Sequence, residues 1–389
     1  MDNILAFRMN ESSTWAKKAR ALALAAERRH AHIQIIEQKV SNSDIRKLMS
    51  FWRPNGIVVA QTPGAGQQVD VRCFSGVPTV FMDCDEAYVP DGFPLTLHDD
   101  AAICEMAIRE LLSIGCTTIA YVGWFEQAHW SRRKSETCRE ILSRHGMDLV
   151  EFRPAARKGK RIYSIYESLL QWLRSLPENT GIFAVNDIMA EQVINVAKKC
   201  GRSFPYDIAV IGVDADENIA ERTSPTLSTI VLDFNAAAEA AFDVMDQMQR
   251  SKGRPRSLIL TPPLKLARRL SSRRFPMKDS EVEAAVERIR QEACTGLTAR
   301  NVLCSFGCSR RVAEAKFRRV VGNSILGEII RTRIEKACEI LADRNVSIGA
   351  IADMCGFPSL SVMQRQFKSA KGATMSAFRL AQKQKSRHQ

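Results

Sequence analysis

Residues 181–216, GIFAVNDIMAEQVINVAKKCGRSFPYDIAVIGVDAD, decide the fold class of this chain. They contain two short apolar runs, at 181–187 and 207–216, on either side of a helical pattern that ends at Gly201. Outward from this stretch, the same kind of apolar run occurs at 4–7, 56–61, 77–83 and 119–124, with an amphipathic helical stretch at 101–116. Short buried strands that alternate with helices predict a parallel α/β sheet with right-handed crossovers.

Three of these apolar runs stop at an aspartate: Asp83, Asp187 and Asp214. Ligands of parallel α/β sheets gather beyond the carboxyl ends of the strands. A carboxylate there can accept hydrogen bonds from two neighbouring hydroxyl groups, as a sugar presents them. The alternative for each residue is a helix N-cap, a common role for aspartate after a strand. The three together favour a polar ligand site.

A family resemblance becomes specific within residues 173–230. The motifs are an apolar strand followed by Asn-Asp, then Pro-x-Asp-Ile-x-Val-Ile-Gly-x-Asp at 205–214 and Ser-Pro-x-Leu-x-Thr-Ile at 224–230. Residues 1–270 thereby resemble the effector domain of the LacI/GalR repressors and the related periplasmic sugar-binding proteins. The resemblance implies two α/β lobes joined by three crossing strands, with a ligand in the cleft. In that family the sugar site is lined by the positions of Asp83, Asn186, Asp187 and Asp214.

An arginine after the first crossing usually faces the sugar in that family. Here residues 129–138 read HWSRRKSETC and do not keep the family's spacing, so Arg132, Arg133 and Lys134 stay open, with Arg132 and Arg133 as the candidates. Tryptophan rings pack well on the apolar C–H face of a sugar. Trp15 is therefore a further candidate, with core or hinge packing as the alternative for it and for Trp124 and Trp130.

The charge of the chain is concentrated at its C-terminal end. A chain of 389 residues suggests two or three domains, and its 45% hydrophobic and 25% charged residues are typical of a globular protein. The formal net charge is +13, and the stretch from Ser271 onward has 22 Lys and Arg against 11 Asp and Glu. A basic unit after a near-neutral body predicts a part that binds a polyanion. The alternative is a solvated basic surface.

Strand signals stop after a basic linker predicted at 271–280, and amphipathic helices are predicted at 281–294 and 327–343. Two segments of this helical region match at an offset of 50, for example Phe317 with Phe367 and Gly322 with Gly372. Each contains a short helix, a turn with glycine, and a serine (Ser309, Ser359) able to cap a second helix. This order predicts helix-turn-helix units at about 300–321 and 347–370, with Val312, Phe317, Val362 and Phe367 packed inward. A generic helical bundle is the alternative.

The second helix of such a unit presents its early residues to base edges in the major groove. Polar side chains occupy these positions in both copies: Arg310, Arg311 and Glu314, then Ser361, Gln364 and Arg365. Arginine can bind guanine, and glutamine adenine, through two hydrogen bonds. Lys368 is expected to contact phosphate.

This region, residues 281–389, resembles the DNA-binding domain of the AraC/XylS transcription regulators. The resemblance is most specific in SIGAIADMCGFPSLSVMQRQFKSAKGATMSAFR at 347–379, while RTRIEKACEIL at 331–341 resembles the connecting helix. Met375 and Ile325 depart from the family's usual proline, and Ala315 from a frequent base-contacting arginine. A LacI-like domain followed by an AraC-like domain is the architecture of the xylose operon regulators.

These observations favour a sugar-responsive transcription regulator that binds promoter or operator DNA. The resemblance implies a pentose such as D-xylose as effector, activation through RNA polymerase, and a homodimer. A repressor, or a regulator of another sugar's operon, is the alternative. A periplasmic transport protein is disfavoured because the N-terminal residues show no secretory pattern and the basic repeat has no use there.

An enzyme is disfavoured because the chain has no P-loop, GxSxG or HExxH motif. We expect no catalytic residue, cofactor or metal site. No apolar run is long enough to span a membrane. The eleven scattered cysteines are expected to be reduced, as in a cytoplasmic protein.

Overall fold

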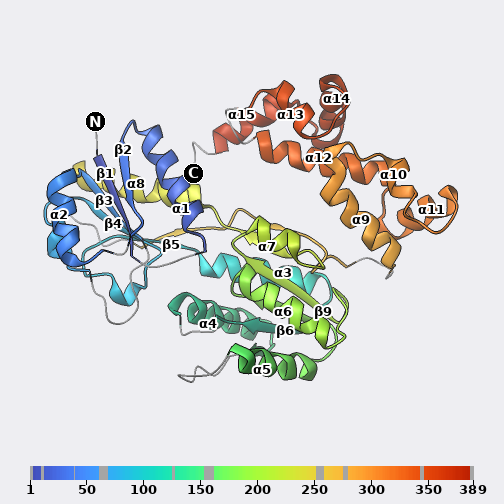
Figure 1. Ribbon diagram of the computed structural model, residues 1–389, viewed down its shortest axis with the longest axis horizontal. Helices are drawn as coiled ribbons and strands as arrows, with labels where there is room; N and C mark the ends of the chain where they lie inside the picture. The colour runs from blue at the N-terminus through green and yellow to red at the C-terminus, as the bar shows by residue number, and fades with distance from the viewer. Residues whose placement is uncertain are drawn as a thin grey trace. The chain divides into compact units, whose positions relative to one another are not determined.

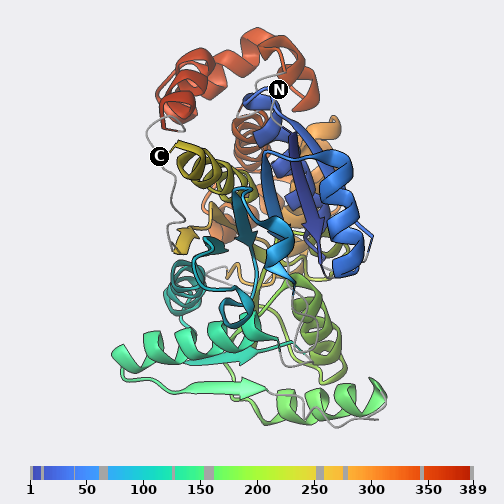
Figure 2. The same ribbon diagram turned by 90° about the vertical axis from the view of Figure 1, so that its left-hand side faces the viewer.

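The structure is a computed structural model that describes residues 3–9, 13–38, 40–60, 69–124, 128–152, 162–250, 258–274, 279–341 and 346–385. The chain divides into two compact units, Met1–Arg273 and Arg274–Gln389. The first unit contains helices and two sheets, and the described part of the second is helical (Figures 1 and 2).

Two six-stranded sheets, one in each lobe, form the first unit. Their strand orders are β11-β5-β4-β3-β1-β2 and β12-β10-β9-β8-β6-β7. All neighbouring strands are parallel except β12, which is antiparallel to β10. The predicted two-lobed parallel α/β fold is therefore confirmed.

The first lobe consists of β1 (Asn3–Arg8), α1 (Trp15–Arg28), β2 (His32–Ile36), α2 (Asn42–Trp52), β3 (Gly56–Ala60), η1 (Val71–Phe74), β4 (Thr79–Met82), η2 (Glu86–Tyr88), β5 (Leu95–His98), α8 (Phe234–Arg250) and β11 (Leu258–Thr261). The second lobe consists of α3 (Asp100–Ser113), β6 (Thr118–Val122), α4 (His129–Arg144), β7 (Leu149–Phe152), α5 (Ile162–Ser175), β8 (Thr180–Ala184), α6 (Asp187–Lys199), β9 (Ile208–Val213), α7 (Glu217–Arg222), β10 (Ser228–Val231) and β12 (Lys265–Ala267). The chain passes between the lobes after β5, after β10 and after β11.

The first sheet shows why these strands read as continuous apolar runs. Side chains alternate between the two faces of a strand. Leu5 and Phe7 of β1 pack with Ile45 of α2 on one face, while Ile4 and Ala6 pack with α1 and α8 on the other. Figure 1 shows α2 on one side of this sheet and α1 and α8 on the opposite side. Both faces are covered, so both must be apolar.

The first unit extends to Arg273, slightly beyond the predicted end at residue 270. Ser271 and Ser272, expected to begin the linker, are fully buried. The Ser271 hydroxyl donates to the Val210 carbonyl (2.7 Å) and accepts from the Ser228 amide (2.8 Å). Residues 275–278 of the predicted linker lie outside the described residues.

The second unit contains α9 (Ser280–Glu292), η3 (Ala293–Thr295), α10 (Ala299–Leu303), α11 (Arg310–Val321), α12 (Ile325–Leu341), α13 (Ile348–Met354), α14 (Leu360–Lys371) and α15 (Met375–Lys385). The pairs α10–α11 and α13–α14 are the two helix-turn-helix units, so this prediction is confirmed. Phe317 and Phe367 are fully buried at equivalent places in α11 and α14. Both helices also end at a glycine with positive φ, Gly322 and Gly372.

Two details of the repeat were predicted wrongly or only in part. Val312 was expected to pack inward, but it is 53% exposed because the buried stripe of α11 runs through Ala313, Phe317 and Val320. The Ser359 hydroxyl accepts a hydrogen bond from the Val362 amide and caps α14, whereas the Ser309 side chain makes no capping bond to α11.

None of the helices within the described residues is long and apolar enough to cross a membrane.

Candidate functional site

Asp83 and Asp214 stand at the carboxyl ends of β4 and β9, one in each lobe. Both have positive φ, 50° for Asp83 and 102° for Asp214. Such backbone conformations are unfavourable for residues other than glycine and are concentrated at functional sites. The surrounding fold must therefore offset the cost of these two backbone conformations.

Lys18 of α1 holds the Asp83 carboxylate. It is only 3% exposed, and its Nζ lies 2.7 Å from Asp83 Oδ2. Burial alone would raise the pKa of Asp83, but chiefly the charged Lys18 amine beside it holds that pKa at about 2. Asp83 is therefore ionised at neutral pH.

His98, at the end of β5, lies against the same carboxylate. Its Nε2 is 3.8 Å from Asp83 Oδ2, and its ring packs edge-on against Phe234. The side chain is 8% exposed, and neither ring nitrogen has a hydrogen-bond partner among the described residues. Burial lowers the pKa of His98, so the imidazole is neutral at neutral pH. A buried polar group without a partner is costly, so this histidine is suited to a bound ligand.

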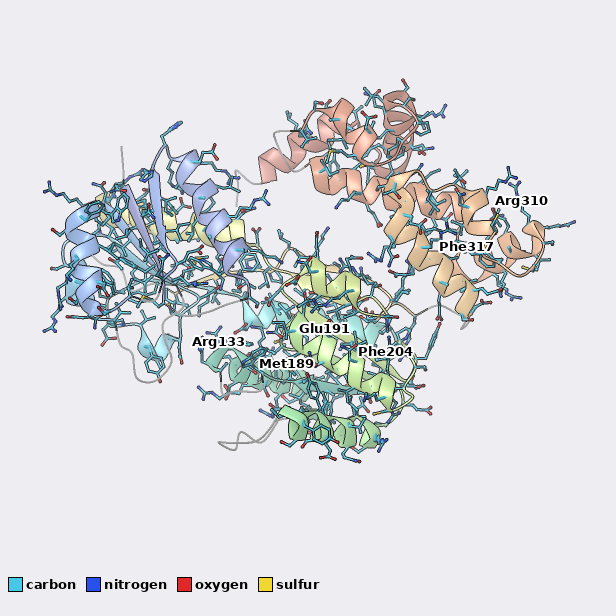
Figure 3. The ribbon with its side chains drawn as sticks, in the orientation of Figure 1. Arg133, Met189, Glu191, Phe204, Arg310 and Phe317 are labelled. Atoms are coloured by element: carbon cyan, nitrogen blue, oxygen red, sulfur yellow. The ribbon has the colours of Figure 1, made fainter. Side chains whose placement is uncertain are left out.

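The packing of α4 on α3 places residues 132–134 in different surroundings. Arg132 is exposed, and its Nε lies 3.9 Å from Glu136 Oε1. Arg133, labelled in Figure 3, and the buried Lys134 both bind Asp100 at the start of α3. Lys134 Nζ lies 2.7 Å from Asp100 Oδ1. Burial would lower the pKa of Lys134, but Asp100 raises it, so the amine stays charged.

Asn186 and Asp187 are used within their own lobe. The Asn186 side chain caps α6 by accepting from the Met189 amide. The Asp187 carboxyl accepts from the Thr229 hydroxyl (2.6 Å) and the Asp216 amide (2.7 Å). Burial and the nearby Asp214 raise the pKa of Asp187 to about 8. Asp187 therefore ties α6 to the loop after β9, while the N-cap of α6, the alternative weighed for Asp187, is Asn186.

A lysine joins the two lobes at this cleft. Lys17 Nζ donates to the backbone carbonyls of Asp214 (2.5 Å) and Ala215 (2.7 Å) across the lobes. Around this contact lies a small cavity of about 10 Å³, lined by Ser13, Thr14, Lys17, Asp187, Ile188, Asp214, Asp216 and Ile219. Burial raises the pKa of Asp214 to about 6, although Lys134, Lys18 and Lys17 oppose this shift.

Trp15 belongs to the core of the first lobe. It is 4% exposed, and its indole N–H donates to Glu37 Oε1 at 3.0 Å. Its polar atom is thus already used within the protein. Trp124 and Trp130 lie near each other, with ring centroids 5.9 Å apart and both rings partly buried.

The sequence reasoning missed Lys17, Lys18, His98 and Asp100. Lys18 carried a signal, because it falls on the same helical stripe as the buried Trp15, Ala21 and Leu22. A charged residue within an apolar stripe needs a buried partner. His98 and Asp100 flank the first crossing and had no comparable signal.

The candidate nucleic-acid interface is formed by the exposed sides of α11 and α14. Arg310, Arg311, Ser361, Gln364, Arg365 and Lys368 are exposed, and Glu314 is partly buried. Figure 3 shows Arg310 and the buried Phe317 on α11. None of the four basic residues forms an ion pair within the described parts of the chain. By contrast, Lys316 of α11 is bound by Asp279 (3.0 Å) and Glu281.

Comparison with known families agrees with this division. Residues 108–272 match the periplasmic binding protein-like domain, and residues 304–381 match a helix-turn-helix domain. The xylose operon regulatory protein of Escherichia coli K12 is 28% identical over 296 residues, covering 76% of this chain and 75% of that protein. The chain is a helix-turn-helix transcription regulator with a periplasmic binding protein-like domain. The protein of the same name from Haemophilus influenzae is 26% identical and covers 74% of this regulator and 75% of that protein.

Solved structures share the fold of the regulator. The structure of a xylose-binding transcription activator aligns with a TM-score of 0.58 and 22% identity, covering 98% of each chain. The lactose repressor bound to an anti-inducer aligns with a TM-score of 0.54 and 17% identity, covering 70% of this chain and all of that one. A LacI-type regulator in complex with D-xylulofuranose has a TM-score of 0.52 and 19% identity over 70% of this chain and all of that one.

Proposed function

We propose that this regulator responds to a neutral sugar of pentose size that binds in the cleft between the two lobes. D-Xylose is the first candidate. The observation that carries the proposal is the group formed by Asp83, Asp214 and the unpartnered His98, which together offer acceptors and a donor for hydroxyl groups. Two relatives are named as xylose operon regulatory proteins, which supports a pentose.

The charges of the cleft favour a neutral ligand over an anionic one. Lys18 is neutralised by Asp83, and Lys134 and Arg133 by Asp100 and the nearby Asp214. A sugar acid or sugar phosphate would bring a further negative charge beside Asp83 and Asp214, where Lys17, already held by two backbone carbonyls, is the remaining cation. Sugar hydroxyls require only acceptors and donors.

A thermal-shift screen against pentoses and hexoses tests the proposal. A ligand that binds only the folded state stabilises it by about 2.7 kcal/mol at a concentration of 100 times Kd. We expect D-xylose to raise the midpoint and hexoses to do so less. Asp214→Ala and Asp187→Ala should each weaken sugar binding by about 1–3 kcal/mol. Glu217→Ala, an exposed carboxylate next to the same loop, is the matched control. No stabilisation by any sugar would refute the proposal.

We propose further that α11 and α14 read operator DNA, with Arg365 as the principal base contact. Arg365→Ala should cost about 1–3 kcal/mol and relax the preference at one or two base pairs. Lys368→Ala should instead weaken binding to all sequences about equally and reduce the salt dependence, as expected for a phosphate contact. Equal effects of the two substitutions on sequence preference would contradict this assignment.

The regulator is proposed to act in the cytoplasm as a homodimer and to activate transcription through RNA polymerase. Sugar and operator must then bias the same two-state equilibrium, so each must tighten the binding of the other by the same factor. Calorimetry of sugar binding with and without operator measures this. If sugar lowers operator affinity instead, the protein is a repressor, which is the alternative function.

A further inference from the structure

The middle of α12 carries a buried arginine. Arg333 is 9% exposed. Among the described residues of the second unit, no other lysine or arginine is buried. Burying a guanidinium is costly unless its donors are satisfied. Its neighbour Arg331, in contrast, is exposed and binds the carboxylates of Glu328 and Glu335.

Arg333 is held by the segment that leads into the first helix-turn-helix unit. Its Nε donates to the Ala293 carbonyl at 2.7 Å, and its Nη2 donates to the Leu297 carbonyl at 3.0 Å. These carbonyls lie on both sides of the Thr295–Gly296 turn, directly before Thr298, which caps α10. The guanidinium therefore fixes the start of α10 to the connecting helix.

The same guanidinium also contacts the second helix-turn-helix unit, α13–α14. Its carbon lies 5.8 Å from the ring centroid of Phe357, which follows Gly356 in the turn between α13 and α14. Gly356 has a φ of +69°, and a Cβ atom there would lie 2.7 Å from the Cys294 carbonyl oxygen. The turn between α13 and α14 is thus packed directly on η3, beside the carbonyls that bind Arg333.

We propose that Arg333 sets the separation and relative orientation of the two reading helices, and so determines which spacing of operator half-sites this regulator accepts. One side chain bridges the start of α10 and the turn before α14. Two reading helices held rigidly should contact successive major grooves about 10–10.5 bp apart. Arg333 is a positioning residue, because it is buried and two of its donors bind backbone carbonyls of the same unit.

The proposal is tested with the full chain and a duplex that the wild-type protein selects from a random DNA library. The two contacted segments are mapped by footprinting, and a set of duplexes is made with one to five base pairs inserted or deleted between them. Arg333→Met keeps an apolar side chain over Phe357 but removes all five donors. Arg331→Met, two residues away on the same helix, is the matched control.

For the wild type and for Arg331→Met, we expect a shift of two base pairs to reduce affinity about tenfold or more, the loss of one reading helix's base contacts. For Arg333→Met, the affinities across the spacing series should differ by less than about threefold, because either helix can then follow its own groove. An unchanged spacing preference would overturn the proposal. So would a uniform loss of affinity at all spacings, which would indicate a role in stability alone.

A second variant keeps the test decisive if Arg333→Met does not fold, as judged by circular dichroism. Phe357→Leu retains the two hydrogen bonds of Arg333 to the segment before α10 and removes the ring beneath the guanidinium. It should broaden the accepted spacing in the same direction and by a smaller factor. A wild-type spacing profile for this variant would also refute the proposal.

Discussion

Gly212 lies where an added methyl group would displace a buried carboxyl. A Cβ atom on this residue of β9 would overlap Asp187 Oδ1 and come within 3.2 Å of Asp187 Cα and Ala190 Cβ. In Gly212→Ala the Asp187 carboxyl must therefore rotate away from Thr229 and Asp216, losing both hydrogen bonds. At about 0.5–1.5 kcal/mol for each bond, the first unit should be destabilised by about 1–3 kcal/mol.

Tryptophan fluorescence during urea unfolding measures this loss selectively. All five tryptophans, at positions 15, 52, 124, 130 and 172, lie in the first unit, so the signal reports on that unit alone. The control is a double-mutant cycle with Asp187→Ala, which removes the overlapping atom. In that background Gly212→Ala should cost less than about 1 kcal/mol, the remainder coming from the contact with Ala190. Equal costs in both backgrounds would refute the assignment to Asp187.

Three further predictions concern single groups. His98→Leu should stabilise the sugar-free first unit, because it removes two buried nitrogens without hydrogen-bond partners, yet weaken sugar binding by about 1–3 kcal/mol. Calorimetry and urea unfolding measure the two effects separately, and a loss of both stability and sugar affinity would contradict the proposed role. Sugar affinity should fall as the pH drops through about 6, because burial raises the pKa of Asp214 to about 6 and only the ionised carboxylate accepts two hydroxyls. The profile of Asp214→Asn should lose this step near pH 6, and a step that persists there would point to another group. Lys316→Gln should lower the melting temperature of the second unit and leave the salt dependence of DNA binding unchanged, because the Lys316 amine binds Asp279 and Glu281. Lys368→Gln should instead reduce the slope of DNA affinity against salt concentration by about one.

Most of the fold could be predicted because it is encoded in local patterns. Strands such as β8 and β9 are buried along their whole length, so their sequences are continuous apolar runs that parallel sheets require. The helix-turn-helix repeat was visible because Phe317 and Phe367, and Gly322 and Gly372, recur at one spacing and perform the same local task. Asp83 and Asp214 followed from the same reasoning, since they stand where strands end.

Other features depended on how elements pack, which no local pattern specifies. Three consecutive basic residues begin α4, and only its rotation against α3 turns Lys134 inward and leaves Arg132 in solvent. Val312 lies outside the buried stripe of α11 by one position, a rotation of about 100° on a helix.

The two-part organisation, the parallel α/β lobes and the repeated reading helices follow from local sequence patterns, because strand and helix periodicity are properties of neighbouring residues. Which polar groups meet depends instead on how distant segments pack in the folded protein. Lys18 and Asp83 are 65 positions apart, and Arg333 reaches the Ala293 carbonyl across 40 positions. Charges and donors separated this far find each other only when burial makes an unpaired group costly, and that cost exists only in the folded protein.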